Sequence, residues 1–120
     1  MSQPGGISIH VVDVSRGVVA SGMHVEVFAA GAERGLLCAG AINSKGVLDD
    51  ALLMSEAMQE GYYEAAFHVA GYYRSAGIAL PARPFLDVVT YRFAIGDTHQ
   101  HYHLPMKVTP WGYSCFRGGT

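Results

Sequence analysis

The most regular strand pattern in the chain is Phe85-Leu-Asp-Val-Val-Thr-Tyr-Arg-Phe-Ala-Ile95. Its side chains fall into an apolar and a mixed set at alternate positions: Val89, Tyr91, Phe93 and Ile95 against Val88, Thr90 and Arg92. Successive side chains of a strand point to opposite faces, so this alternation predicts a β-strand with one buried face.

Further short strands are predicted on both sides of this segment. They span residues 7–13, 23–28, 36–42, 62–69, 101–108 and 111–117, with a very short one at 47–48. In the strand 23–28, His24 and Glu26 share one face and Val25 and Val27 the other. One short helix is expected at 72–78, and 52–60 is expected to be a loop with at most one helical turn. Seven or eight short strands and one minor helix predict an all-β sandwich of two sheets, and residues 1–120 form a single domain.

Composition narrows the classes of partner. Half of the 120 residues are hydrophobic and 15% are charged, which suits a packed core and suggests apolar surface hidden against other subunits. The eight Lys and Arg residues are scattered and the net charge is -2, so nucleic acid is not an expected partner. No secretory signal and no apolar run of roughly 20 residues is present, so no membrane association is expected. Cys38 and Cys115 are expected to be free thiols in a cytoplasmic protein.

The six histidines raise the question of a metal site. In a strand, His101 and His103 point to the same face, as two ligands would, and His99 continues that spacing. The alternative is that these are ordinary edge or surface histidines, because His-x-His is a weak motif by itself. His24 and His68 lie among alternating strand residues and are interpreted as structural or solvated.

His10 interrupts an otherwise apolar strand. It is either a structural residue or a general base, since a neutral imidazole accepts protons near neutral pH. Ser44, Ser114 and Cys115 lie in no recognised nucleophile motif, and the glycines match no nucleotide-binding pattern. A water molecule activated by histidine fits these residues better than a covalent nucleophile.

The C-terminal segment Trp111-Gly-Tyr-Ser-Cys-Phe-Arg-Gly-Gly-Thr120 is aromatic where most termini are polar. It is either a docked segment in which Arg117 binds an oxygen or carboxylate, or an edge strand with a glycine-rich tail.

Two long motifs resemble one family. They are His101-Tyr-His-Leu-Pro followed by Thr109-Pro-Trp-Gly-Tyr-Ser-Cys-Phe-Arg-Gly118, and Ile9-His-Val-Val-Asp-Val-Ser-Arg-Gly17 near the start. Both are similar to motifs of the 5-hydroxyisourate hydrolases, enzymatic relatives of transthyretin, and the similarity covers residues 7–118. The resemblance implies a transthyretin-like sandwich of two four-stranded sheets, assembled as a homotetramer from two dimers with active sites in a central channel.

The same resemblance implies the activity and its residues. The reaction would be hydrolysis of the cyclic amide of 5-hydroxyisourate, a purine-derived small molecule, with no cofactor and no bound metal. By motif position, His10, His103 and Arg117 would be catalytic. His101 would lie nearer the channel mouth, and Ser114 would face the channel.

Several positions depart from the family pattern. Val47 follows Gly46 where the family has an Arg that reaches the substrate, Phe116 replaces a Tyr, and Gly119 replaces a Ser and is followed by Thr120. Val47 would suit a methyl group, so an N-methylated 5-hydroxyisourate, as oxidation of caffeine-type purines would give, is expected as an alternative substrate.

The sequence is therefore compatible with three functions. The first is a hydrolase of 5-hydroxyisourate or a methylated analogue. The second is a non-catalytic binding protein for an aromatic small molecule, and the third is a metal-binding β-protein that uses His99, His101 and His103.

Overall fold

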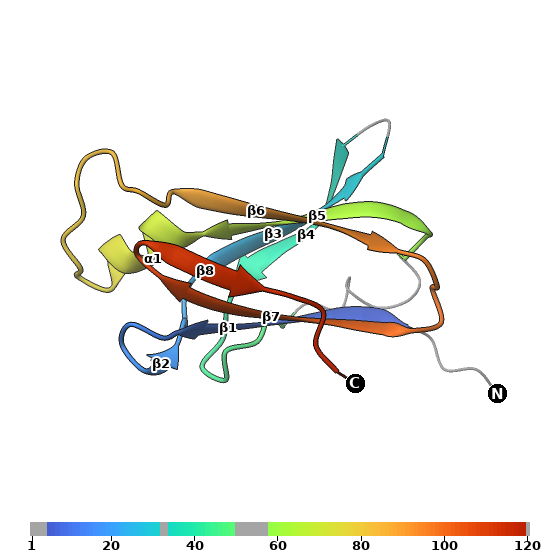
Figure 1. The fold of residues 1–120 in the computed structure, drawn as a ribbon, viewed down its shortest axis with the longest axis horizontal. Helices are drawn as coiled ribbons and strands as arrows, with labels where there is room; N and C mark the ends of the chain where they lie inside the picture. Colours follow the sequence, from blue (N-terminus) through green and yellow to red (C-terminus); the bar gives the residue numbers. More distant parts are fainter. Residues whose placement is uncertain (1–4, 32–33, 50–57, 120) are drawn as a thin grey trace.

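The chain folds into two stacked β-sheets with one short helix at one end (Figure 1). The computed structural model describes residues 5–31, 34–49 and 58–119. Across the first sheet the order is β2 (Val18–Val19), β1 (Gly6–Asp13), β7 (His101–Thr109) and β8 (Gly112–Cys115). Across the second sheet it is β4 (Arg34–Ala41), β3 (His24–Ala30), β5 (Gly61–His68) and β6 (Val88–Ile95). The predicted all-β sandwich of two four-stranded sheets is confirmed.

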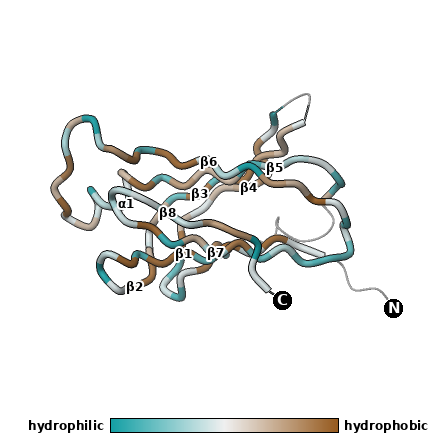
Figure 2. The backbone as a smooth tube through the Cα atoms, in the orientation of Figure 1, coloured by the Kyte–Doolittle hydropathy of each residue, from teal (hydrophilic) through white to brown (hydrophobic). Residues whose placement is uncertain are grey.

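The core lies between the two sheets. Figure 2 shows hydrophobic and hydrophilic residues following one another along the strands. In β6, Val89 and Ile95 are buried while Val88, Thr90 and Arg92 are exposed, as the alternation predicts. The most deeply buried core side chains come from both sheets: Ile9, Val11, Val25, Val27, Phe67, Leu104, Met106 and Val108. Burying a side chain of this size stabilises the fold by about 1.5–3 kcal/mol.

The centre of the first sheet is a parallel pair formed by β1 and β7. Their register places Ser8 beside His103 and His10 beside Pro105. Antiparallel β8 then pairs with β7, with Ser114 opposite Lys107. Residues from the two ends of the chain are therefore neighbours in the middle of one sheet.

The helix α1 (Val69–Ser75) begins three residues before the predicted start at residue 72 and ends before the predicted end at 78. The amides of Val69 and Ala70 both donate to the carbonyl of Asp87, which begins the helix directly at the end of β5. His68, at the N-cap, makes no side-chain hydrogen bond that caps the helix. A start that depends on this long-range contact leaves no Ser, Thr, Asp or Asn signal in the sequence.

Two short pairings complete the sheets. The connection after β1 contains the two-residue strand β2, which is not among the strands predicted from the sequence. The predicted short strand at 47–48 is present as two isolated bridges, in which Val47 pairs with His10 and Leu48 with Ile42. Most of the segment 52–60, predicted to be a loop, lies outside the described residues. No helix in the described part of the chain has the length and hydrophobicity to span a bilayer.

A buried carboxylate ties the end of β1 to the helix. Asp13 is fully buried and accepts hydrogen bonds from the hydroxyls of Tyr72 (2.9 Å), Tyr73 (2.8 Å) and Ser15 (2.6 Å). The backbone amides of Ser15 and Arg16 also donate to it. Burial alone would raise the pKa of Asp13, but these hydrogen bonds outweigh it and hold the pKa below its ordinary value. The carboxylate thus fixes the turn after β1 and the position of α1 together.

Candidate active site

Three histidines lie on the outer face of the first sheet, the face turned away from the second sheet. In β7, His101 and His103 are half-buried and alternate with the buried Tyr102 and Leu104. In β1, His10 alternates with the buried Ile9 and Val11 in the same way. Period-two alternation in the two adjacent strands therefore puts all three imidazoles on one face, as the sequence predicted for His101 and His103.

Ser8 joins two of these histidines. Its Oγ lies 2.7 Å from Nδ1 of His103 and 2.8 Å from Nε2 of His101. A hydroxyl has one proton to donate and two lone pairs to accept with, so the direction of each bond depends on the tautomers of the two imidazoles. The tautomers of His101 and His103 are consequently coupled through one hydroxyl.

Ser8 was not among the site residues predicted from the sequence. A signal was available, because Ser8 precedes His10 by two residues and so shares its face. Its histidine partners, however, depend on the parallel register of β1 and β7, which no local pattern contains.

His103 is held in its neutral form. Its pKa lies below the ordinary value, first because burial penalises the imidazolium, and then because the charges of His10 and His101 oppose a further positive charge. A neutral imidazole with Nδ1 occupied by Ser8 presents Nε2 as its second ring nitrogen. Such a group can accept a proton from water near neutral pH.

A glycine packs against each of two histidine rings. A Cβ at Gly46 would lie 2.7 Å from Nε2 of His10, and Gly46 also has a positive φ of 85°. A Cβ at Gly118 would lie 2.9 Å from Cδ2 of His103 and 3.0 Å from Cγ of Pro105. The amide of Gly118 donates to the carbonyl of His103 at 2.7 Å. Both positions therefore need a residue without a side chain if the rings are to keep their places.

Val47 lies directly beside His10, with which it forms an antiparallel bridge. The turn before it is fixed by Asn43, whose side-chain oxygen accepts from the amide of Val47 at 3.1 Å. A long side chain at position 47 would start next to the imidazole of His10. Position 47, where the family pattern has an Arg, therefore lies at the edge of the histidine face.

Two further predicted residues come from the C-terminal strand. Ser114 is exposed and pairs with Lys107, which alternation places on the same face of β7 as His101 and His103. Phe116 follows β8 and is 43% exposed. Ser114 therefore extends the histidine face, and Phe116, like Trp111 and Tyr113, is an exposed aromatic side chain.

Arg117 is placed apart from the imidazoles. Its guanidinium donates to the side-chain oxygen of Gln100 at 3.0 Å and lies 4.0 Å from the centre of the Tyr102 ring. Within the described residues, no hydrogen bond joins Arg117 to the imidazole of His10 or His103. One chain places His10, His101, His103, Val47 and Ser114 on one sheet face, whereas the guanidinium of Arg117 bonds to Gln100 and to the backbone carbonyl of His101.

The histidine face is a sheet surface, and a hollow lies elsewhere. That hollow is beside α1 and is lined by residues that include Arg16, Val18, Tyr72 and Ser75. None of the predicted site residues contributes to it.

Comparison with known proteins agrees with this architecture. The HIUase/Transthyretin family model matches residues 7–118. The chain belongs to the HIUase/transthyretin family. It is 42% identical over 119 residues to a 5-hydroxyisourate hydrolase of Deinococcus radiodurans, with 98% of this chain and 99% of that protein covered. It is 39% identical to 5-hydroxyisourate hydrolase 2 of Rhizobium meliloti, again with 98% of this chain and 99% of that protein covered.

Two solved structures share the fold. The structure of Klebsiella pneumoniae 5-hydroxyisourate hydrolase has a TM-score of 0.78 and 25% identity, with 96% of this chain and 99% of that chain covered. The crystal structure of an (S)-allantoin synthase has a TM-score of 0.90 and 30% identity. It matches 98% of this chain, which spans only 45% of that longer chain.

Proposed function

We propose that this chain is a hydrolase of the 5-hydroxyisourate type, which opens a cyclic amide in a purine-derived ring. The observation that supports it most directly is the arrangement of His10, His101 and His103 on one sheet face, with His103 neutral and bonded to Ser8. Its relatives of the same length carry the name 5-hydroxyisourate hydrolase, which agrees with this chemistry.

In the proposed reaction, water attacks the carbonyl carbon of the ring amide. His103 accepts a proton from that water through Nε2, while Ser8 holds the imidazole by its other nitrogen. The carbon–nitrogen bond then breaks and the ring nitrogen takes a proton, which His103 can return or His10 can supply. The ring opens with the net addition of one water, and the two histidines require no metal ion for these steps.

Arg117 is proposed to stabilise the negative charge that develops on the carbonyl oxygen. Its guanidinium donates to the side chain of Gln100 and to the backbone carbonyl of His101 and lies over the ring of Tyr102, so within the chain it bonds to no imidazole. We therefore propose that the site is completed by association of subunits as a homotetramer. The exposed aromatic residues Trp111, Tyr113 and Phe116 lie at β8, the edge strand of the first sheet, where a second subunit would cover them.

Val47 is proposed to relax or alter the choice of substrate. A polar ring edge next to an isopropyl group loses the hydrogen bonds that an Arg would supply, whereas a methyl group loses nothing there. An N-methylated 5-hydroxyisourate is accordingly the proposed alternative substrate.

The test is to generate 5-hydroxyisourate and its trimethyl analogue in situ and to follow their ultraviolet decay. Both compounds decay unaided, so the rate in buffer is subtracted. The protein should accelerate at least one, and His103→Asn should remove the acceleration while His99→Asn, a change at an exposed turn, should not. If the protein accelerates the decay of neither compound, the proposed hydrolase activity is refuted.

The substrate preference has its own test. Val47→Arg should shift the ratio of kcat/KM values toward the unmethylated ring by about tenfold or more, which corresponds to about 1.4 kcal/mol of transition-state binding. Val18→Arg, which adds the same charge at an exposed position of β2, should leave the ratio unchanged. An unchanged ratio in Val47→Arg would mean that position 47 does not face the substrate.

A further inference from the structure

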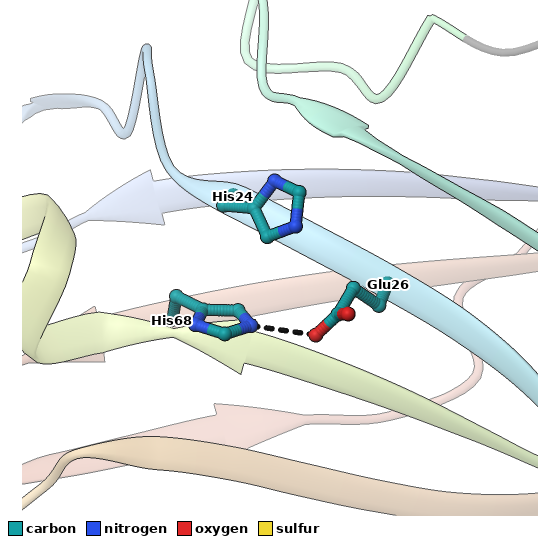
Figure 3. A group of neighbouring side chains, drawn as sticks. All are labelled: His24, Glu26 and His68. Carbon is teal, nitrogen blue, oxygen red and sulfur yellow. Dashed lines mark hydrogen bonds and ion pairs between the residues drawn. The ribbon is translucent and has the colours of Figure 1, made fainter. Parts of the chain in front are cut away.

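A second group of chemically versatile side chains lies on the opposite side of the molecule. His24, Glu26 and His68 meet on the outer face of the second sheet (Figure 3). Each offers one ligand atom, and these atoms all lie within 4.8 Å of one another. Among the described residues they form a group with the size and composition of a metal-binding triad, well separated from the face that carries His10 and His103.

The sheet register brings the three together. His24 and Glu26 lie two residues apart on β3, so their side chains share a face. Val25 pairs with Phe67 on β5, which makes His24 and His68 neighbours across the two strands. Their rings are 4.9 Å apart at an angle of 62°, and Nε2 of His68 lies 2.6 Å from Oε1 of Glu26.

Small neighbours leave the group accessible. In the adjoining strands, Glu26 is flanked by Ala39 of β4 and Ala66 of β5, and His24 by Ala41 of β4. No bulky side chain at these positions covers the space above the three ligand atoms. An ion bound there would have room to keep one or more water molecules.

The charge of Glu26 is suited to a cation. The pKa of Glu26 lies below its ordinary value, chiefly because of the hydrogen bond with His68. Burial raises this pKa, whereas the charges of His68, His24 and Arg34 lower it further. Arg34, the nearby competing cation, is bonded to Glu64 at 3.0 Å rather than to Glu26. Within the described residues, the carboxylate of Glu26 therefore pairs with His68 and not with Arg34.

We propose that His24, Glu26 and His68 form a binding site for a divalent transition-metal ion of the zinc type. Two imidazoles and one carboxylate are ligands that zinc takes in proteins, and a water molecule can fill the fourth position. At zinc–ligand distances of about 2.0–2.2 Å, tetrahedral ligand atoms are about 3.4 Å apart. The contact between His68 and Glu26 would have to widen from 2.6 Å, and the widest separation would have to close from at most 4.8 Å. Both changes are about 1.5 Å or less, and the ion would join β3 to β5.

This proposal departs from the sequence expectation that the chain binds no metal and that His24 and His68 are structural or solvated. It is independent of the proposed hydrolase activity, because none of the three residues lies on the face that carries His103.

Titration calorimetry with zinc chloride on tag-free, reduced protein tests the proposal. The parent should bind one zinc ion per chain at this site, and His68→Gln should weaken that binding by about tenfold or more. His99→Gln is the matched control, since His99 is an exposed histidine beside a carboxylate, Asp97, but has no third ligand. It should bind zinc as the parent does.

Two further measurements separate the site from other zinc ligands. His24→Gln should reproduce the loss, which guards against a folding defect peculiar to His68→Gln, and the unfolding midpoint without metal confirms that each variant is folded. Cobalt should give a spectrum of nitrogen and oxygen ligands without thiolate bands, which excludes Cys38 and Cys115. If the parent binds no zinc, or if His103→Asn loses the ion while His68→Gln keeps it, the proposal is wrong.

Discussion

Asp13→Asn should destabilise the fold severely without touching the histidine face. The carboxylate accepts from the hydroxyls of Tyr72, Tyr73 and Ser15, and all three are donors. An asparagine side chain keeps one oxygen but places an amide, itself a donor, where the second oxygen was. At least one buried tyrosine hydroxyl would then lose its acceptor. All three hydroxyls would also lose their interaction with a negatively charged acceptor.

The magnitude follows from the burial of the groups. A hydrogen bond to a charged acceptor is worth about 1.5–3 kcal/mol, and two such bonds, from Tyr72 and Tyr73, are inaccessible to water. Ser15 and Arg16 are exposed and can turn to water, so they recover most of their loss. The expected decrease in the free energy of unfolding is therefore about 3–5 kcal/mol, a large part of the roughly 5–15 kcal/mol of a typical domain.

Urea denaturation followed by fluorescence, together with calorimetry, measures this loss. Parent and variant must be compared at equal protein concentration, because any assembly adds to the apparent stability. A decrease of this size lowers the Tm of a chain of 120 residues by about 10–20 °C. Asp97→Asn, at a half-exposed carboxylate in a turn, is the control and should cost less than about 1 kcal/mol. A loss below about 1 kcal/mol in Asp13→Asn would refute the account of the buried network.

The pH dependence has a definite sign. Because the pKa of Asp13 is lower in the folded chain than its ordinary 3.8, the ionised carboxylate stabilises the fold above pH 3.8. That stabilisation is lost as the pH falls through the lower folded pKa. The difference in stability between the parent and Asp13→Asn should therefore narrow in acid, and a constant difference down to the acid transition would contradict it.

Two further predictions concern the histidine face. Ser8→Ala removes the hydrogen-bond partner that His101 and His103 share, so kcat should fall by about tenfold or more. The decrease should be smaller than the factor of about 10²–10⁴ expected when a general base is lost, and the pH profile of kcat/KM should also shift. Ser75→Ala, at the exposed end of α1, is the control and should change neither kcat nor the pH profile. Gly118→Ala puts a methyl group 2.9 Å from the His103 ring, so kcat should fall while the protein stays folded by circular dichroism. Gly119→Ala meets no atom within 4 Å and should keep the parent rate; equal rates in the two alanine variants would show that the position of the His103 ring does not limit the reaction.

Local alternation predicted which residues share a face. The pattern in 85–95 gave the inward and outward sides of β6 correctly, and the spacing of His101 and His103 put both on one face of β7. Those are properties of a single strand, so they follow from the two-residue period alone. The all-β class followed from repeating that reasoning along the chain.

Contacts between strands could not be predicted from the sequence. Ser8 meets His103 because β1 and β7 pair in parallel in one register, and a shift of one residue would turn Ser8 to the other face. The meeting of His24 and Glu26 with His68 depends in the same way on the register of β3 and β5. The start of α1 likewise depends on the carbonyl of Asp87, nearly twenty residues along the chain.

The proposed assembly of subunits would account for the position of Arg117. The two-residue period of a strand determines which side chains share a face, and the register determines which side chains of neighbouring strands meet. A sheet face is nevertheless open to solvent on one side, so it cannot by itself exclude water from a reacting amide. One chain supplies His10, His101 and His103 for such a site, whereas the guanidinium of its Arg117 lies over the Tyr102 ring and donates to Gln100 and to the carbonyl of His101. The proposed tetramer supplies the missing wall, and with it either a second chain's arginine or the reason for Arg117 to leave Gln100. The segment 111–118 would then have two roles. Its strand β8 pairs with β7, and its exposed aromatic side chains lie where the subunits are proposed to meet.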